Sequence, residues 1–424
     1  MRIMIIAGGS RGDVQPYVAL GVGLQTAGHT VRVLASMNFR ALITAHGLEF
    51  FAMNDLTEAM TQERVRELAE QGNLLKMLAT TGRGAQQLAH QAAVAGLAAA
   101  SGSDLLIGGL GGLSVGVALA EKLGVPFIQA YLMPFSPTRE FPSVLTPVPQ
   151  SRLTAWANAS LHRMARQMMW QTLRSADNKA RAQVLQLPPA PFWGPFAALH
   201  AQAQPILYGY SPQVVPRPQD WDATIHVTGY WFLPPPAGWE PSTDLVDFLQ
   251  AGPPPVYIGF GSMPSRNPQE TADLVLRALA QTGQRGILST GWGGLKAEEL
   301  PTTVHMVGSL PHEWLFPQMA AVVHHGGAGT TAAGLAAGVP SIVTPFFGDQ
   351  PYWGRRVHAL GVGPAPIPRR RLTVDNLAAA IHQAVTDRAM RQHAVTLGEH
   401  IRAERGIEAA VAVIQQTGAA RKVV

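Results

Sequence analysis

The chain of 424 residues contains no cysteine, so neither a disulfide framework nor thiolate chemistry contributes to its function. The missing cysteines do not identify a cellular compartment. Charged residues are also scarce, at 14%, whereas 47% of the residues are hydrophobic. This balance is typical of a folded globular protein and excludes a disordered chain. At this length we expect two domains rather than one.

Long hydrophobic runs are missing too. One uncharged apolar stretch, residues 105–120, is rich in glycine and shorter than the roughly 20 residues that a membrane-spanning helix needs. The apolar start, residues 1–7, is too short for a secretory signal, and Arg11 and Asp13 follow closely. We therefore expect a cytoplasmic protein with no integral membrane segment.

Neither nucleic acid nor a metal ion is an expected partner. The net charge is +5, but apart from residues 369–371 the basic residues are spread out and do not alternate with aromatic residues. Asp220 and Asp222 have a spacing that would suit a divalent ion. They lie in a proline-rich segment, which favours a solvated loop, and no histidine or cysteine spacing suits zinc.

Short apolar segments alternate with helical stretches along most of the chain, a pattern that predicts parallel α/β sheets. Strands are expected at residues 2–7, 30–35, 105–107, 127–129, 256–260, 287–289, 304–307 and 341–344, and helices include 14–25 and 268–281. Proline clusters interrupt the pattern and predict a semi-rigid linker. The expected organisation is a domain at 1–215, a linker at 216–254, a second domain at 255–400, and a C-terminal helix at 401–424 that packs back on the first domain. A ligand is expected in the cleft between two such domains.

Residues 133–200 fit this alternation less well, because methionine and tryptophan are frequent there. Such residues usually form core or interface packing. The alternative is an apolar wall for a hydrophobic substrate, since methionine adapts to irregular apolar shapes. On that interpretation Met133, Phe135, Met164 and Met168 are candidate contacts.

A glycine-rich turn follows the first predicted strand, at residues 8–13. Its spacing differs from that of a dinucleotide-binding fingerprint, and the second strand does not end in an acid, which counts against NAD or FAD. Asp13 has two interpretations. It either caps the following helix or takes a proton from an acceptor hydroxyl.

A second glycine-rich segment, residues 324–331, lies between an apolar strand and a helical stretch. Backbone N–H groups at such a helix start approach an anion closely. His325 either donates to a phosphate oxygen or is a buried, satisfied imidazole, whereas His324 fits core packing better. Thr330 is suited both to capping the helix and to donating to phosphate. Ser262, which follows the strand at 256–260, faces the same cleft.

Two further turns follow predicted strands. Asp349 and Gln350 either stabilise a turn or hold sugar hydroxyls. Trp292 either stacks near a base or covers its own turn. A diphosphate and a sugar are the groups that these segments would bind together.

Three blocks resemble the UDP-glycosyltransferase family of GT-B fold enzymes, most closely its sterol glucosyltransferases and the bacterial enzymes that glycosylate natural products. The blocks are residues 9–16, residues 311–317, and residues 324–331 together with 345–350. The resemblance implies two Rossmann-like parallel-sheet domains that face a cleft. It also implies inverting transfer without a metal ion or other cofactor.

The resemblance assigns roles residue by residue. Asp13 matches a general base, and Ser10, Arg11 and Gly12 lie beside the diphosphate. The diphosphate-binding stretch corresponds to His325, Gly327, Gly329 and Thr330, and the sugar-binding pair to Asp349 and Gln350. Plant members begin their donor motif with a tryptophan that stacks on the base. Here that position falls near Ser309, so Trp292 and the Val307 backbone are the candidates. Plant members also use a histidine near the N-terminus as the base, and residues 1–28 contain none.

The expected function is transfer of a hexose, glucose from UDP-glucose, to a hydroxyl of a hydrophobic acceptor such as a sterol, triterpenoid or polyketide. The alternative is a catalytically inactive nucleotide-sugar-binding protein that acts as a sensor or auxiliary subunit. The sequence leaves open the acceptor, the choice between uridine and thymidine in the donor, and the oligomeric state.

Overall fold

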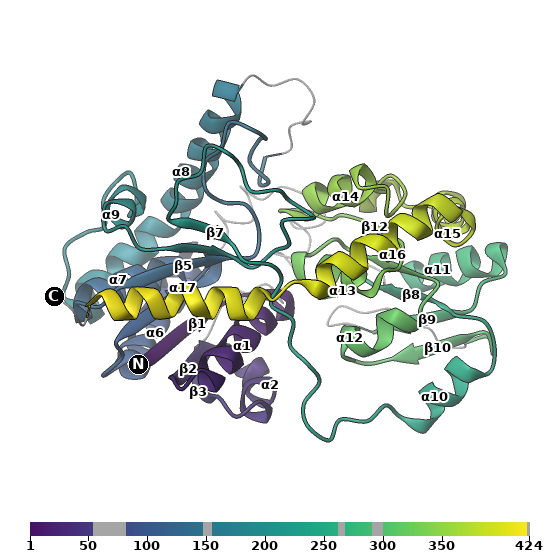
Figure 1. Ribbon diagram of the computed structural model, residues 1–424, viewed down its shortest axis with the longest axis horizontal. Coiled ribbons are helices and arrows are strands. Elements are labelled where there is room, and N and C mark those ends of the chain that lie inside the picture. The colour runs from purple at the N-terminus through teal and green to yellow at the C-terminus, as the bar shows by residue number, and fades with distance from the viewer. Residues whose placement is uncertain (54–81, 147–154, 262–267, 291–299, 422–424) are drawn as a thin grey trace. The chain divides into compact units, whose positions relative to one another are not determined.

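The computed structural model describes residues 1–53, 82–146, 155–261, 268–290 and 300–421. The described residues form two compact units (Figure 1). The first comprises the chain up to Leu233 together with the residues from Arg405 onward, and the second comprises Pro234–Glu404. The boundary at Leu233 falls inside the segment that the prolines predict as a linker.

The first unit contains a seven-stranded parallel sheet with the order β3-β2-β1-β4-β5-β6-β7. Its strands are β1 (Arg2–Ala7), β2 (Thr30–Ala35), β3 (Glu49–Ala52), β4 (Leu105–Gly108), β5 (Phe127–Tyr131), β6 (Ile206–Tyr208) and β7 (Ile225–Val227). All residues of β4 and β5 are buried, as expected for central strands that helices cover on both faces.

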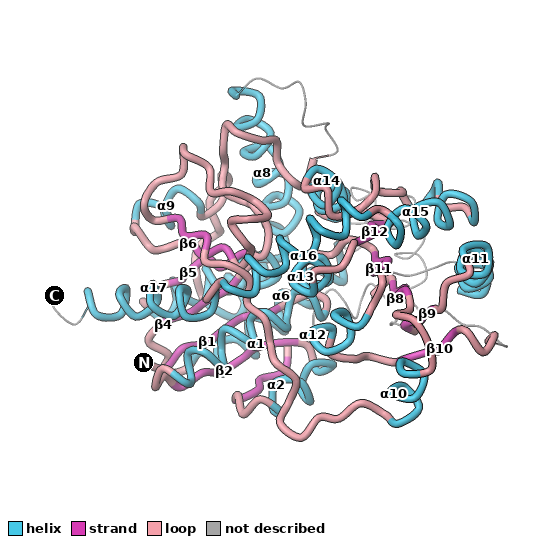
Figure 2. Tube along the Cα trace, turned by 45° about the vertical axis from the view of Figure 1, so that its right-hand side comes forward, coloured by secondary structure: helices cyan, strands magenta, loops and turns pink. Residues whose placement is uncertain are grey.

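Helices surround this sheet (Figure 2). They are α1 (Arg11–Thr26), α2 (Arg40–Ala45), α6 (Gly82–Ala100), α7 (Leu113–Leu123), α8 (Ala155–Ala180), α9 (Phe196–Ala201) and α17 (Gly406–Arg421), with the short helices η1 (Met37–Phe39), η2 (Leu110–Gly112) and η3 (Arg181–Leu185). Helix α17 packs on α1, where Gly23 has no side chain and so lets Ile407 approach closely. Ala410 and Ile414 of α17 thereby join the core of the first unit.

The second unit contains a five-stranded parallel sheet with the order β10-β9-β8-β11-β12. Its strands are β8 (Val256–Gly259), β9 (Gly286–Ser289), β10 (Val304–Val307), β11 (Ala321–His324) and β12 (Ser341–Val343). Its helices are α10 (Thr243–Gln250), α11 (Pro268–Thr282), α12 (His312–Leu315), α13 (Ala328–Ala337), α14 (Gln350–Ala359), α15 (Val374–Thr386) and α16 (Arg388–Ala403), with η4 (Phe316–Gln318) and η5 (Arg369–Arg371).

The prediction of two parallel α/β sheets is confirmed. The differences lie where the sequence alternation is weak. Strands β3, β6 and β7 were not predicted, and for β6 and β7, which have three residues each, no helix was predicted nearby to indicate the alternation. The methionine- and tryptophan-rich region holds the long helix α8 rather than a further strand–helix pair.

Candidate functional site

Each sheet has a point where the strand order reverses, and open α/β sheets bind their ligands at the carboxyl ends of the strands there. In the second sheet this point lies between β8 and β11, because β8 continues to β9 on its other side. Gly261 follows β8 and His325 follows β11. The topology therefore brings together two segments that are more than sixty residues apart in the sequence.

The imidazole of His325 lies between two glycines. A Cβ atom on Gly261, whose φ is +62°, would come within 2.8 Å of Cε1 of the ring, and a Cβ on Gly327 would collide with Nε2. Burial lowers the pKa of His325 to about 4, so the ring is neutral near pH 7. Its Nδ1 atom is buried without a hydrogen-bond partner among the described residues.

His324 has a different role, as the sequence pattern suggested. It is fully buried, and its Nδ1 accepts the N–H of Gly326 at 3.0 Å. Burial, together with the neighbouring His325 and His312, lowers the pKa of His324 to about 3. The ring therefore holds the backbone of the glycine-rich turn at Gly326, whose φ of +87° favours glycine.

Helix α13 begins at Ala328, three residues after His325, with Gly327 as its N-cap residue. The first backbone N–H groups of a helix have no partner within it and form its positive end. Gly329 and Thr330, both partly exposed, lie in this first turn, whereas Thr331 is fully buried. The turn and the imidazole thus form the kind of site that suits a phosphate group.

The predicted sugar-binding pair lies at the start of α14. Oδ2 of Asp349 accepts the indole N–H of Trp353 at 2.7 Å, which orients the carboxylate. The Oε1 atom of Gln350 accepts the backbone N–H groups of Phe346 and Phe347, at 2.8 Å and 3.2 Å. Gln350 is 5% exposed, so its amide oxygen shapes the turn. Trp353 was not recognised from the sequence, although its position four residues after Asp349 places both on one helix face.

In the first sheet the order reverses between β1 and β4, and Asp13 lies in the helix that follows β1. Ser10 is the N-cap residue of α1. Its backbone N–H and its Oγ both donate to Oδ2 of Asp13, each at 2.8 Å. A Cβ on Gly9 would lie 2.6 Å from the same Oδ2 atom. Asp13 is therefore an exposed carboxylate that two hydrogen bonds hold in place, in a capping box with Ser10.

Tyr17 lies one turn after Asp13 and was not recognised from the sequence. Its hydroxyl donates to the carbonyl oxygen of Ala130 at 2.5 Å. Burial raises the pKa of Tyr17 well above its ordinary value, and the nearby charge of Asp13 raises it further. Arg11, beside the capping box, donates from Nε to Oε1 of Gln15 at 3.0 Å. These contacts hold the first two turns of α1, which carry Asp13, in place.

The four candidate acceptor residues do not share one environment. Phe135 is 3% exposed, and the guanidinium of Arg166 lies 5.4 Å from the centre of its ring. Met133 is half-buried. Met164 and Met168, by contrast, are 60% and 51% exposed on the outer face of α8.

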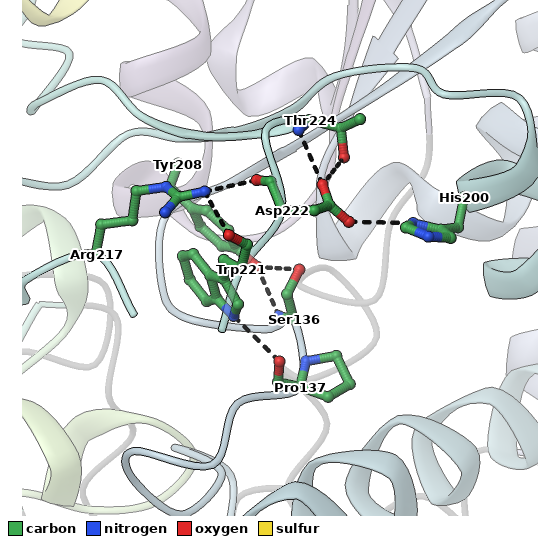
Figure 3. Close-up of polar contacts among 8 residues, drawn as sticks. All are labelled: Ser136, Pro137, His200, Tyr208, Arg217, Trp221, Asp222 and Thr224. Carbon is green, nitrogen blue, oxygen red and sulfur yellow. Dashed lines mark hydrogen bonds and ion pairs between the residues drawn. The ribbon is translucent and has the colours of Figure 1, made fainter. Parts of the chain in front are cut away.

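A network of polar contacts fixes the segment around Phe135 (Figure 3). The Tyr208 hydroxyl accepts the Ser136 N–H at 2.6 Å and donates to its Oγ at 2.8 Å, and the Trp221 indole donates to the carbonyl oxygen of Pro137.

The two carboxylates next to this network, Asp220 and Asp222, also accept hydrogen bonds. Asp220 accepts from Thr138 and the Arg139 backbone, and Asp222 accepts from Thr224. These two acids therefore have structural partners, and no group of three potential metal ligands occurs in the part of the chain that the structure describes.

The remaining predictions concern three donor-binding candidates and the membrane. Ser262 and Trp292 lie outside the described residues. Val307 ends β10, and its carbonyl oxygen accepts the N–H of Thr290 at 3.0 Å. Within the described residues, no helix has the length and hydropathy needed to span a bilayer.

Comparison with known proteins matches both halves of the chain to glycosyltransferases. The glycosyltransferase family 28 N-terminal domain matches residues 3–142, and the erythromycin biosynthesis protein CIII-like C-terminal domain matches residues 290–414. Sterol 3-beta-glucosyltransferase UGT80B1 of Arabidopsis thaliana is 38% identical over 97% of this chain, and UGT80A2 of the same plant is 36% identical over 97%. The chain spans 67% and 64% of these two relatives, and 27% of a Cryptococcus neoformans sterol 3-beta-glucosyltransferase that is 36% identical over 98% of the chain.

Solved structures show the same fold. Spinosyn forosaminyltransferase SpnP has a TM-score of 0.67 at 16% identity, covering 99% of both chains. The Streptomyces sp. SF2575 glycosyltransferase SsfS6, complexed with thymidine diphosphate, has a TM-score of 0.60 at 23% identity, covering 98% of this chain and 99% of that one. The two parallel sheets, the two matched domains and the sterol-type relatives place this chain in the UDP-glycosyltransferase family of GT-B fold enzymes.

Proposed function

We propose that the protein transfers a hexose, glucose from UDP-glucose, to a hydroxyl group of a hydrophobic acceptor such as a sterol, triterpenoid or polyketide. The observation that carries the proposal is the neutral imidazole of His325 at the N-terminus of α13. A neutral imidazole and the N-terminal N–H groups of a helix suit the oxygens of a diphosphate. The names of the plant and fungal relatives support a sterol-like acceptor and a glucosyl donor.

The proposed reaction is a single displacement with inversion. The acceptor hydroxyl oxygen forms a bond to the anomeric carbon, the bond from that carbon to the diphosphate oxygen breaks, and the hydroxyl proton passes to Asp13. Negative charge then grows on the departing diphosphate, where His325, Thr330 and the helix N-terminus stabilise it. Asp349 holds hydroxyls of the sugar, because its carboxylate is already oriented by Trp353.

The proposal assigns Asp13 the role of base, and the Asp13→Asn variant tests this. An asparagine retains an oxygen that accepts from Ser10, so the helix start is preserved while the proton acceptor is lost. We expect transfer to fall by about 10²- to 10⁴-fold, the range for one acid–base group, with unchanged UDP affinity by calorimetry.

Ser10→Ala is the matched control. It removes one hydrogen bond to the carboxylate and leaves the carboxylate itself, so the loss of transfer should be far smaller. If Asp13→Asn transfers the sugar at close to the wild-type rate, Asp13 acts only as a capping residue and another group serves as the base.

The donor and acceptor are tested together in one screen. UDP-glucose and TDP-glucose are each incubated with sterols, triterpenoids, polyketides and flavonoids, and glycosylated products are identified by mass spectrometry. We expect the highest turnover with UDP-glucose and a sterol. Slow release of UDP from UDP-glucose without acceptor identifies a catalyst, whereas an inactive binding protein releases none.

A further inference from the structure

Five large apolar side chains remain exposed on one side of the first unit. They are Trp156 (76% exposed), Met164 (60%) and Met168 (51%) on α8, and Phe192 (53%) and Trp193 (75%) in the loop before α9. We call them the α8 patch. The three α8 residues are spaced by eight and four positions and therefore share one helix face. In Figure 1 the N-terminal end of α8 projects away from the strands of its unit.

The loop that carries Phe192 and Trp193 is held firmly against α8. The carbonyl oxygen of Phe192 accepts from the side chains of Gln167 and Gln171, at 3.0 Å and 2.5 Å. The indole N–H of Trp170 donates to the carbonyl oxygen of Pro191 at 3.0 Å, and Asn178 accepts the N–H of Ala190 at 2.7 Å. These hydrogen bonds thus hold Phe192 and Trp193 in a position where their side chains are exposed to solvent. Because exposing them is unfavourable, the arrangement indicates a partner that covers them.

The charges around the α8 patch identify the kind of partner. Helix α8 carries Arg163, Arg166, Arg174 and Lys179, and its single acid, Asp177, is buried. Arg163 is exposed beside Met164, and the Arg174 guanidinium lies 5.6 Å from the ring centre of Phe192. Residues 190–201 contain no acid. The exposed charged side chains of α8 and of residues 190–201 are cations, and exposed tryptophans beside them fit the interface of an anionic bilayer, where the rings enter the headgroup region and the cations meet phosphate.

We propose that the α8 patch docks this protein on the surface of a membrane that contains anionic phospholipids. Trp156 and Trp193 enter the interface, and Arg163 and Arg174 contact lipid phosphates. The inference stands on the exposed side chains and charges alone. It is also compatible with the proposed function, because a sterol-like acceptor resides in bilayers.

Sedimentation with large unilamellar vesicles tests the proposal. Vesicles of phosphatidylcholine alone are compared with vesicles that also contain phosphatidylglycerol, using the full chain and no sugar donor. We expect binding to the anionic vesicles that weakens as salt is added, since surface charge is screened. The variant that combines Trp156→Ser and Trp193→Ser should lose at least ~10-fold in lipid affinity.

Met37→Ser is the matched control, because Met37 is 51% exposed in the same unit but belongs to another segment. It should bind vesicles like the wild type. Transfer to an acceptor in free solution should stay unchanged in both variants, which separates this inference from the proposed reaction and also reports folding. Equal binding by the double variant and the wild type, or no binding to either vesicle, overturns the proposal. A dimer in sedimentation velocity that the double variant abolishes, without vesicle binding, assigns the α8 patch to a second copy of the chain instead.

Discussion

The proposed donor site of the second unit is centred on one side chain, which lies between two glycines. His325 fits only because Gly261 and Gly327 lack side chains. The sequence identified His325 from the glycines that follow it. It could not identify Gly261, because that contact arises from the pairing of β8 with β11.

His325→Ala should weaken UDP binding by about 10- to 100-fold, the value of one hydrogen bond to a charged group. The neutral ring donates to a diphosphate oxygen, so the loss should appear in the binding enthalpy measured by calorimetry. His382→Ala, at an exposed position on α15, is the control and should bind UDP normally. Equal affinities in the two variants would remove His325 from the donor site.

Gly9 supports a second prediction at the residue scale. Its φ is +126°, and a Cβ there would lie 2.6 Å from the Asp13 carboxylate. Gly28 also has a positive φ, +84°, but nothing lies within 4 Å of its Cβ position. Gly28→Ala should cost about 1–2 kcal/mol of unfolding free energy from backbone strain alone, whereas Gly9→Ala should cost more and also lower transfer. Denaturant unfolding and initial rates check this pair. Normal transfer by Gly9→Ala would mean that the position of Asp13 is not critical.

The positions of several strands were predicted better than their ends, since the fully buried β4 and β5 extend one and two residues beyond the predicted ends. Strands β1, β2 and β10 begin and end at the predicted residues. Helix α13 starts four residues before its predicted stretch, because the glycine-rich segment itself begins the helix. Amphipathic spacing could not distinguish a packed methionine from an exposed one on α8, since that depends on which face the first unit covers.

The turn before α14 shows how an element can depend on one amide. Replacing Gln350 with leucine removes the acceptor of two backbone N–H groups while preserving the volume of the side chain. We expect Gln350→Leu to lower the unfolding free energy by about 1–3 kcal/mol, because backbone donors lose their partner. Gln392→Leu, on the exposed face of α16, should change it by less than about 0.5 kcal/mol. Similar unfolding curves would show that Gln350 serves only the ligand.

At the scale of the whole molecule, buried histidines make stability depend on pH. Burial lowers the pKa of His162 to about 4, of His325 to about 4 and of His324 to about 3, from 6.5. Below pH 6.5 the unfolded chain therefore binds protons that the folded chain does not, and stability falls as the pH drops toward 4. Burial raises the pKa of Asp177 from 3.8 to about 6, so its contribution is present at low pH and lost as the pH rises through 6. The three histidines together change the free energy of unfolding more than Asp177 does, so the net effect of lowering the pH is a loss of stability.

We therefore expect the melting temperature to decrease steadily between pH 6.5 and pH 4, measured by circular dichroism in buffers of constant ionic strength. His162→Gln keeps a neutral donor for the carbonyl oxygen of Phe141, so its melting temperature should depend less steeply on pH than that of the wild type. Identical slopes would exclude His162 from the effect.

The return of the chain to the first unit has a practical consequence for engineering. Among the described residues, the chain leaves that unit after Leu233 and rejoins it at Arg405, so α17 and α1 form one packed pair from opposite ends of the sequence. A hybrid of two relatives with a single crossover near the middle of the sequence would pair α1 of one parent with α17 of the other. The close contact between Gly23 and Ile407 would then join residues from different parents. Exchanging the second unit between relatives therefore calls for two junctions, with residues 234–404 moved as one segment.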